Sequence, residues 1–89
     1  MTVHNENILN MDFRTLIRID PDILGGQPVF AGTRVPIETL FDHLEAGVPL
    51  DEFLADFPTV SKAQAVALLE TANKLLTSSN VAQLYAAAA

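Results

Sequence analysis

Cysteine is absent from this chain of 89 residues, which excludes disulfide bonds and thiolate zinc sites. Basic residues are scarce as well: five Lys and Arg stand against eleven Asp and Glu, and the formal net charge is −6 at pH 7. Nucleic-acid binding depends on neutralising phosphates with basic side chains, so the charge disfavours a strong stand-alone DNA binder. A protein partner with a basic surface fits this charge better.

Long apolar runs are also missing, and none approaches the length of a membrane span. The first ten residues are polar and include Glu6, unlike a secretory signal. We therefore expect a cytoplasmic protein. At this length we expect one structured domain with a small core.

Glycine and proline, few elsewhere, gather in residues 25–36, which predicts a segment of turns. Within it, Val29-Phe30 and Thr33-Arg34-Val35 flank Ala31-Gly32, which predicts a hairpin with a two-residue link. Pro36 then suits the first turn of a helix, because proline has no N–H group to leave unpaired there.

A second β-like run, Leu-Ile-Arg-Ile-Asp at residues 16–20, ends before Pro21. Arg18 lies between Ile17 and Ile19, which is the alternation of a half-buried strand. Two or three such short strands are too few to be stable alone, so they must pack on helices or on a second copy of the chain.

Three helices are predicted after the β element, at about residues 36–46, 50–56 and 61–76. The first has apolar side chains at i, i+3, i+4 and i+7. The third begins with a capping box, Ser61 and Gln64. The predicted fold class is α+β, mostly α: a short N-terminal β element followed by a three-helix, helix-turn-helix core.

This pattern divides the chain into a flexible N-terminus at residues 1–12, a helix-turn-helix domain at 13–76 and a C-terminal tail at 77–89. Residues 77–80 predict a break after the third helix. The alanine-rich remainder of the tail has the composition of a last helical piece.

No group of residues in the sequence has the pattern of a catalytic site. His4 and His43 are far apart and lack a third ligand nearby, so no metal site is predicted. His43, on a polar helix flank, is expected to be solvated. Asp51 and Glu52 are explained by the dipole of the helix that they begin. We expect no enzyme activity, no cofactor and no small-molecule substrate.

In a DNA-reading arrangement the third helix would face the bases, with Lys62 and Gln64 first and Asn73 and Lys74 further along. Ala63, Ala67, Glu70 and Thr71 are predicted to share its exposed face. A plain solvated face explains the same residues. Arg34 also has two interpretations: an ion pair with Glu38 or Asp42, or a contact with a partner or a phosphate.

Several motifs together resemble a known family. They are Arg18-Ile19-Asp20-Pro21, Gly25-Gly26-Gln27-Pro28-Val29, Gly32-Thr33-Arg34-Val35-Pro36, the Leu44 to Gly47 helix end, Asp51-Glu52-Phe53-Leu54 with Phe57-Pro58, and Gln64-Ala65-Val66. The chain is similar in these motifs to the small bacterial proteins called domain of unknown function 433. The similarity covers about residues 13–75 and departs from the family pattern at Pro49, where members often have a capping serine or threonine.

The resemblance implies a winged or homeodomain-like helix-turn-helix fold. It also implies an antitoxin that neutralises a PIN-like ribonuclease toxin and, with it, binds and represses the shared promoter DNA. It supplies no catalytic residues. The tail lies outside the shared region and is a candidate partner-specific segment, so its Leu84 and Tyr85 are candidate partner-binding residues. Arg34, at the end of the predicted hairpin, is a third candidate.

The alternative function is a stand-alone helix-turn-helix transcription regulator that reads DNA as a dimer. A homodimer is expected in either case, because pairing the open edges of a short sheet across two chains would cover them.

Overall fold

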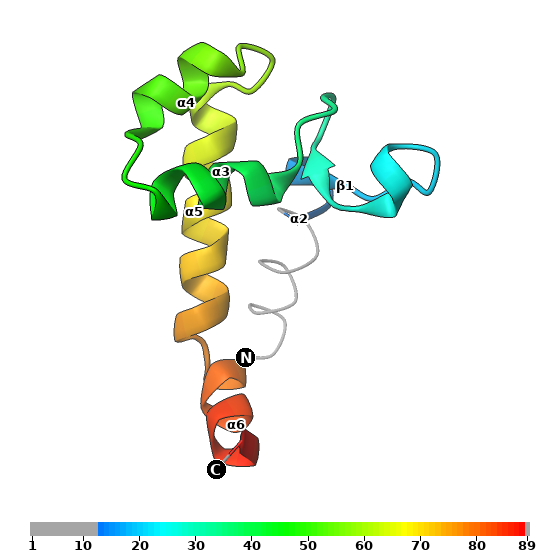
Figure 1. Cartoon of the computed structure of the whole chain (residues 1–89). Coiled ribbons are helices and arrows are strands. Elements are labelled where there is room, and N and C mark those ends of the chain that lie inside the picture. Colours follow the sequence, from blue (N-terminus) through cyan, green and yellow to red (C-terminus); the bar gives the residue numbers. More distant parts are fainter. Residues whose placement is uncertain (1–12, 89) are drawn as a thin grey trace.

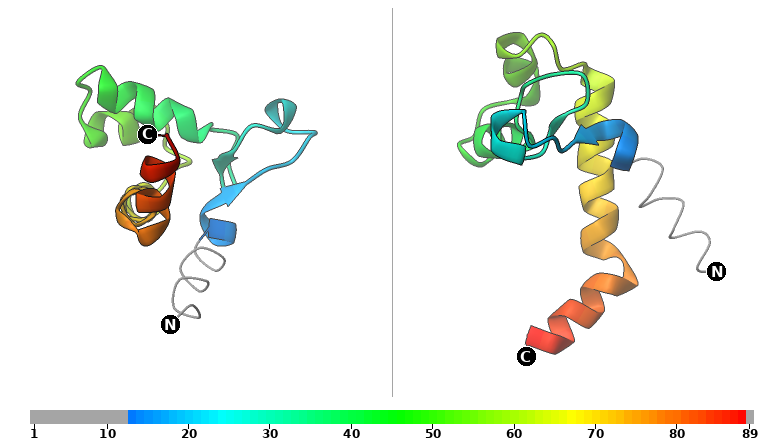
Figure 2. Two further views of the ribbon diagram at one scale, coloured as in Figure 1. Left: turned by 90° about the horizontal axis from the view of Figure 1, so that it is seen from below. Right: turned by 90° about the vertical axis from the view of Figure 1, so that its right-hand side faces the viewer.

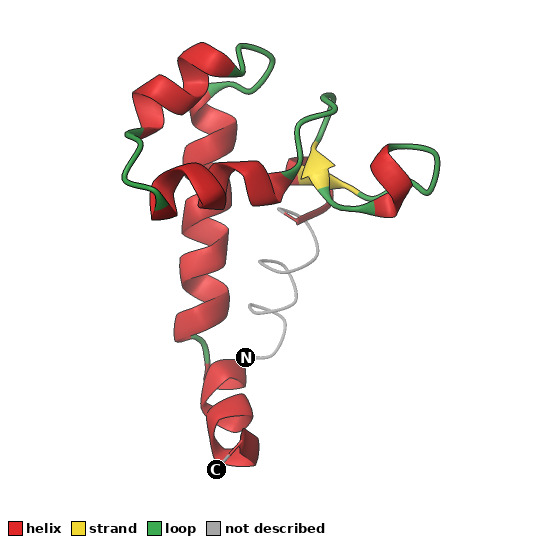
Figure 3. Cartoon of the chain, viewed as in Figure 1, coloured by secondary structure: helices red, strands yellow, loops and turns green. Residues whose placement is uncertain are grey.

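The structure is a computed structural model that describes residues 13–88, so the expected flexible N-terminus lies outside the described residues. Most of the described chain is helical (Figure 3). The elements are α2 (Phe13–Leu16), β1 (Ile17–Arg18), η2 (Leu24–Gly26), β2 (Val29–Phe30), α3 (Ile37–Glu45), α4 (Leu50–Asp56), α5 (Lys62–Thr77) and α6 (Ser79–Ala88). The predicted class, α+β and mostly α, is confirmed.

The sheet has two strands, and β1 pairs with β2 in antiparallel orientation, with Ile17 opposite Phe30. The strand predicted over residues 16–20 is shorter, because a turn begins at Asp20. The Asp20 carboxylate accepts a hydrogen bond from the Asp22 N–H at 2.8 Å, and the Asp20 carbonyl accepts one from the Ile23 N–H at 2.9 Å. The pairing stops at Arg18, and Ile19 is exposed to solvent.

The hairpin after β2 forms, but its link is longer than predicted. The Phe30 N–H donates to the Val35 carbonyl at 2.9 Å, and Val29 pairs with Pro36 in an isolated antiparallel bridge. The loop therefore contains four residues, 31–34, and the prediction of a two-residue link was wrong.

Thr33 stabilises this longer loop with its hydroxyl group. Its Oγ1 donates to the Phe30 carbonyl at 2.9 Å and accepts from the Val35 N–H at 3.0 Å, so one hydroxyl group bridges the two ends of the loop. Gly32 takes the left-handed backbone that the turn requires, at φ +77°. Pro36 lies one residue before the helix, with an extended ψ of 142°, rather than in its first turn.

The link between α3 and α4 is a Schellman motif. Gly47, at φ +83°, donates its N–H to the Leu44 carbonyl, and the Val48 N–H reaches the His43 carbonyl at 2.9 Å. Helix α4 begins at Leu50 and ends at Asp56, the predicted limits, although Pro49 provides no side-chain cap.

The core is one cluster between the β element and the three helices α3, α4 and α5. Its buried members are Phe30, Leu40, Phe53, Val60, Ala65 and Leu68. In Figure 2, α3 and α4 lie beside the first half of α5, with the β element next to α3. Each element thus contributes only one or two side chains to a shared centre, and none has a core of its own.

His43 belongs to the edge of this core, not to solvent as predicted. Its ring meets Phe53 and Phe57 edge to face, with centroids 5.4 and 5.5 Å away. Its Nδ1 donates to the Thr39 carbonyl at 2.8 Å. The half-buried ring is therefore held by two aromatic side chains and one hydrogen bond.

Helix α5 ends at Thr77, and Ser78 alone separates it from α6, where a break over residues 77–80 was predicted. The tail is therefore helical through Ala88. Figures 1 and 2 show α6 extending from the end of α5 that is remote from α4. Within residues 13–88 no helix has the length and apolar character that a membrane span needs.

Candidate functional site

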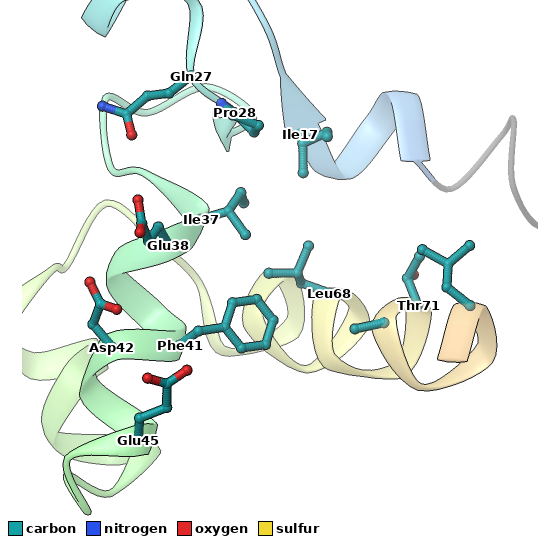
Figure 4. A pocket seen from close by; sticks show the side chains of 12 residues that line it. Ile17, Gln27, Pro28, Ile37, Glu38, Phe41, Asp42, Glu45, Leu68 and Thr71 are labelled. Atoms are coloured by element: carbon teal, nitrogen blue, oxygen red, sulfur yellow. The ribbon is translucent and has the colours of Figure 1, made fainter. Parts of the chain in front are cut away.

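A groove of about 630 Å³ lies between α3 and α5 and is closed at one end by the β element. Figure 4 shows Ile17, Ile37, Phe41 and Leu68 converging on it from three elements. The lining residues are Ile17, Gln27, Pro28, Ile37, Glu38, Phe41, Asp42, Glu45, Leu68, Thr71, Ala72 and Leu75.

The inside of the groove is mainly apolar. Ile37 and Phe41 lie four residues apart on α3, and Leu68, Ala72 and Leu75 follow the i, i+4, i+7 spacing on α5. Apart from buried Leu68, these side chains are only half-buried. Ile37 and Phe41 pack against the core cluster. All four half-buried side chains keep part of their surface open to the groove, so apolar area is left for a partner to cover.

One edge of the groove is acidic. Glu38, Asp42 and Glu45 lie along the α3 side in Figure 4 and are exposed. No Lys, Arg or His is among the lining residues. Among the residues whose side chains the structure describes, none forms an ion pair with these three carboxylates. The ion pair found in that part of the chain joins Arg18 and Asp20.

Thr71, which was expected on the exposed face of α5, lies buried beside the groove instead. Its Oγ1 donates to the Ala67 carbonyl of the preceding turn at 2.8 Å. The helix itself satisfies the hydroxyl, so burying this polar residue leaves no unpaired group.

Gln64, a candidate DNA-binding residue, is used inside the fold. Its Oε1 accepts from the Ser61 N–H while its backbone N–H donates to Ser61 Oγ, which confirms the predicted capping box. Its Nε2 also donates to the Ala31 carbonyl at 2.8 Å, which ties the hairpin loop to the start of α5. The sequence pattern predicted the capping role of this side chain but not its bond to the hairpin loop.

Replacing Gln64 by alanine removes the reciprocal half of the capping box and the bond to the Ala31 carbonyl. We expect the free energy of unfolding to fall by about 1–2 kcal/mol, since one cap and one partly buried hydrogen bond are lost. Urea denaturation measures this difference. Gln83→Ala, at an exposed position of α6, is the control and should change stability by less than about 0.5 kcal/mol. Equal losses for both variants would contradict a structural role for Gln64.

The other candidate DNA-binding residues, Lys62, Asn73 and Lys74, are exposed on α5. The structure does not bring them together. Lys62 and Lys74 are separated by twelve residues of one helix, about 18 Å at 1.5 Å per residue. The start of α5, which would face base edges, thus offers one lysine and a glutamine that is already bonded.

Arg34 is exposed in the hairpin loop, and the ion pair expected with Glu38 or Asp42 does not form. It lines a second concavity with Arg18, which sequence reasoning had assigned only to a strand. Arg18 is partly neutralised by Asp20, with Nη2 and Oδ2 3.3 Å apart. The pKa of the Asp20 carboxyl is below its ordinary value. The main cause is the hydrogen bond from the Asp22 N–H, and the Arg18 guanidinium lowers the pKa further.

The candidate partner-binding residues Leu84 and Tyr85 are on the outside of α6, with 68% and 71% of their surfaces exposed. Val81 lies on the same side of the helix by spacing. Leu76, near the end of α5, is 68% exposed as well. Leu84 and Tyr85 thus lie uncovered on α6. Figure 1 shows α6 away from the hairpin that follows the β element.

The groove was missed from sequence because its walls come from residues 17–75, and no single motif contains them. One signal was available: Glu38, Asp42 and Glu45 share one face of the predicted helix at i, i+4 and i+7, and that helix contains no Lys or Arg.

Comparisons with known proteins agree with this architecture. An uncharacterized protein of Sinorhizobium fredii (strain NBRC 101917 / NGR234), y4eO, is 34% identical over 64 residues, which are 70% of this chain and 29% of that protein. The chain thus spans less than a third of that curated relative. The crystal structure of a DUF433 member protein from Anabaena variabilis ATCC 29413 has a TM-score of 0.59 and 25% identity, covering 96% of this chain and 81% of that one.

A family model described as "Protein of unknown function (DUF433)" matches residues 17–71, which is more than half of the chain. The matched region contains the β element, the hairpin and the three core helices to Thr71. The chain therefore belongs to the DUF433 family.

Proposed function

We propose that this protein is the antitoxin of a toxin–antitoxin pair, which neutralises a PIN-like ribonuclease by protein–protein binding and takes part in repressing their shared promoter. The observation that carries the protein-binding part is the uncovered apolar surface of α6, with Leu84 and Tyr85 exposed. The kind of partner comes from the family resemblance in the sequence motifs.

The exposed apolar side chains support a protein partner for an energetic reason. Leaving leucine and tyrosine side chains in water forgoes roughly 25 cal/mol per Å² of apolar area that a partner would cover. Tyrosine is also among the residues that dominate binding energies at interfaces. A helix that extends from the end of α5 can reach a partner without disturbing the core cluster.

The charge supports the same assignment. A net charge of −6 opposes close approach to DNA, and Lys62 has no basic neighbour at the start of α5. A stand-alone dimeric regulator, the alternative, reads DNA with α5 and would have to rely on Lys62 and on Lys74, about 18 Å further along that helix. In the proposed pair, the toxin supplies part of the positive surface that the promoter needs.

The test is a capture experiment followed by an enzyme assay. The tagged chain is retrieved from its native cytosol, bound proteins are identified by mass spectrometry, and a recovered PIN-like nuclease is purified. We expect RNA cleavage by that nuclease to fall to background at an equimolar amount of the chain. Undiminished cleavage, or recovery of promoter DNA at moderate salt with no nuclease, would overturn the proposal, and the second result would favour the stand-alone regulator.

A further inference from the structure

We propose that the groove between α3 and α5 is a docking site for a basic amphipathic helix of a partner protein. The inference rests on the proposed function only in naming the nuclease as the protein that carries this helix. No residue of α6 lines the groove, so substitutions can be made in one surface without changing the other.

The groove has the form that suits a helix. Its α5 wall presents Leu68, Ala72 and Leu75 one turn apart, and its α3 wall presents Ile37 and Phe41 at the same spacing. Rows of side chains at i and i+4 form the ridges between which side chains of another helix fit. A volume of about 630 Å³ accommodates several apolar side chains from one face of such a helix.

The edge of the groove selects for positive charge. Glu38, Asp42 and Glu45 rise about 10 Å along α3, at 1.5 Å per residue over seven residues. A docked helix with its apolar face inward and Lys or Arg at matching i, i+4 and i+7 positions would pair with all three. These carboxylates lie at the exposed edge of the groove, so each pair with a cation of the docked helix would add a modest amount of binding energy.

Other occupants fit the groove less well. Helix α6 of a second copy is apolar enough, but its ten residues, SNVAQLYAAA, include no charged side chain. It would leave all three carboxylates without partners. A nucleic acid would bring phosphates next to the same carboxylates, which is repulsive.

A synthetic helical peptide tests the proposal without the nuclease. The probe has 15 residues, with Leu at i, i+3, i+4 and i+7, Lys at the flanking positions and Ala elsewhere; a second peptide has Glu in place of each Lys. Binding to the full chain is followed by NMR titration. We expect the Lys peptide to shift the resonances of Phe41, Leu68, Ala72 and Leu75, and the Glu peptide to leave them in place.

Two pairs of matched variants locate the site. The triple variant Glu38→Gln, Asp42→Asn and Glu45→Gln should bind the Lys peptide about tenfold more weakly at low salt, because three exposed ion pairs are lost. Asp51→Asn with Glu52→Gln and Asp56→Asn removes the same charge from exposed positions of α4 and should change affinity less than about threefold. Ala72→Phe should block the groove, whereas Ala63→Phe, at an exposed position of α5 that does not line it, should not. Circular dichroism confirms that each variant is folded.

The outcomes separate this inference from the proposed function. Equal binding of both peptides, equal weakening by the two charge variants, or shifts outside the groove would overturn the docking site, even if the chain inhibits a nuclease. Movement of the groove resonances with chain concentration alone would overturn it in favour of a second copy. Peptide binding with the expected variant pattern, without nuclease inhibition, would retain the docking site and remove only the identity of its partner.

Discussion

Replacing Phe53 by alanine is expected to lower the free energy of unfolding by about 3–5 kcal/mol. Phe53 is fully buried, and its ring lies 6.3 Å from that of Phe30 and 5.0 Å from that of Phe57, measured between centroids. Alanine would remove the apolar area and leave a cavity at the point where α4 meets the hairpin. Small domains have only about 5–15 kcal/mol in total, so a large share of the stability depends on this side chain.

Urea denaturation followed by circular dichroism measures the Phe53→Ala effect. Leu84→Ala is the control, because it also removes a large apolar side chain but from an exposed position on α6. It should change stability by less than about 0.5 kcal/mol. A Phe53→Ala loss no larger than that of Leu84→Ala would mean that the described core is not the centre of the cooperative unit.

Changing Leu84 and Tyr85 together to aspartate is expected to weaken binding of the proposed nuclease partner at least about 100-fold, which corresponds to about 3 kcal/mol. Both side chains are exposed, so the change should leave the core intact. In the complex, however, two carboxylates would replace the apolar contacts and would be buried without partners. Isothermal titration calorimetry with the purified nuclease measures the loss.

The matched control for that pair is Gln83→Asp with Ala86→Asp. It adds the same charge to the same helix at exposed positions, but on the side away from Leu84 and Tyr85. We expect a change in affinity of less than about fivefold. If the control weakens binding as strongly as the Leu84 and Tyr85 change, net charge rather than the apolar face of α6 governs the interaction.

Local signals predicted the helices well. The capping box of Ser61 and Gln64 set the start of α5, and Gly47 set the end of α3, because each acts through hydrogen bonds between near neighbours in sequence. The resemblance in the motifs also identified the family that the match over residues 17–71 shows.

Features that depend on distant residues were not predictable in the same way. Thr71 is buried because α2 and α3 pack near that face of α5. Gln64 gained a second role only when the fold brought Ala31 to it across 33 positions of sequence. The groove was not predictable for the same reason: its two walls, α3 and α5, are separate in sequence and meet only in the folded chain.

Ser78 has a mechanical consequence for the whole tail. Its ψ of 172° is the one departure from helical geometry between Lys62 and Ala88. At a helical ψ of about −42°, α5 and α6 would form a continuous rod about 40 Å long. A change in the ψ angle of Ser78 alone would therefore reorient the whole of α6, which is about 15 Å long. The direction in which Leu84 and Tyr85 face is therefore set at a single joint, independently of the packed core behind it.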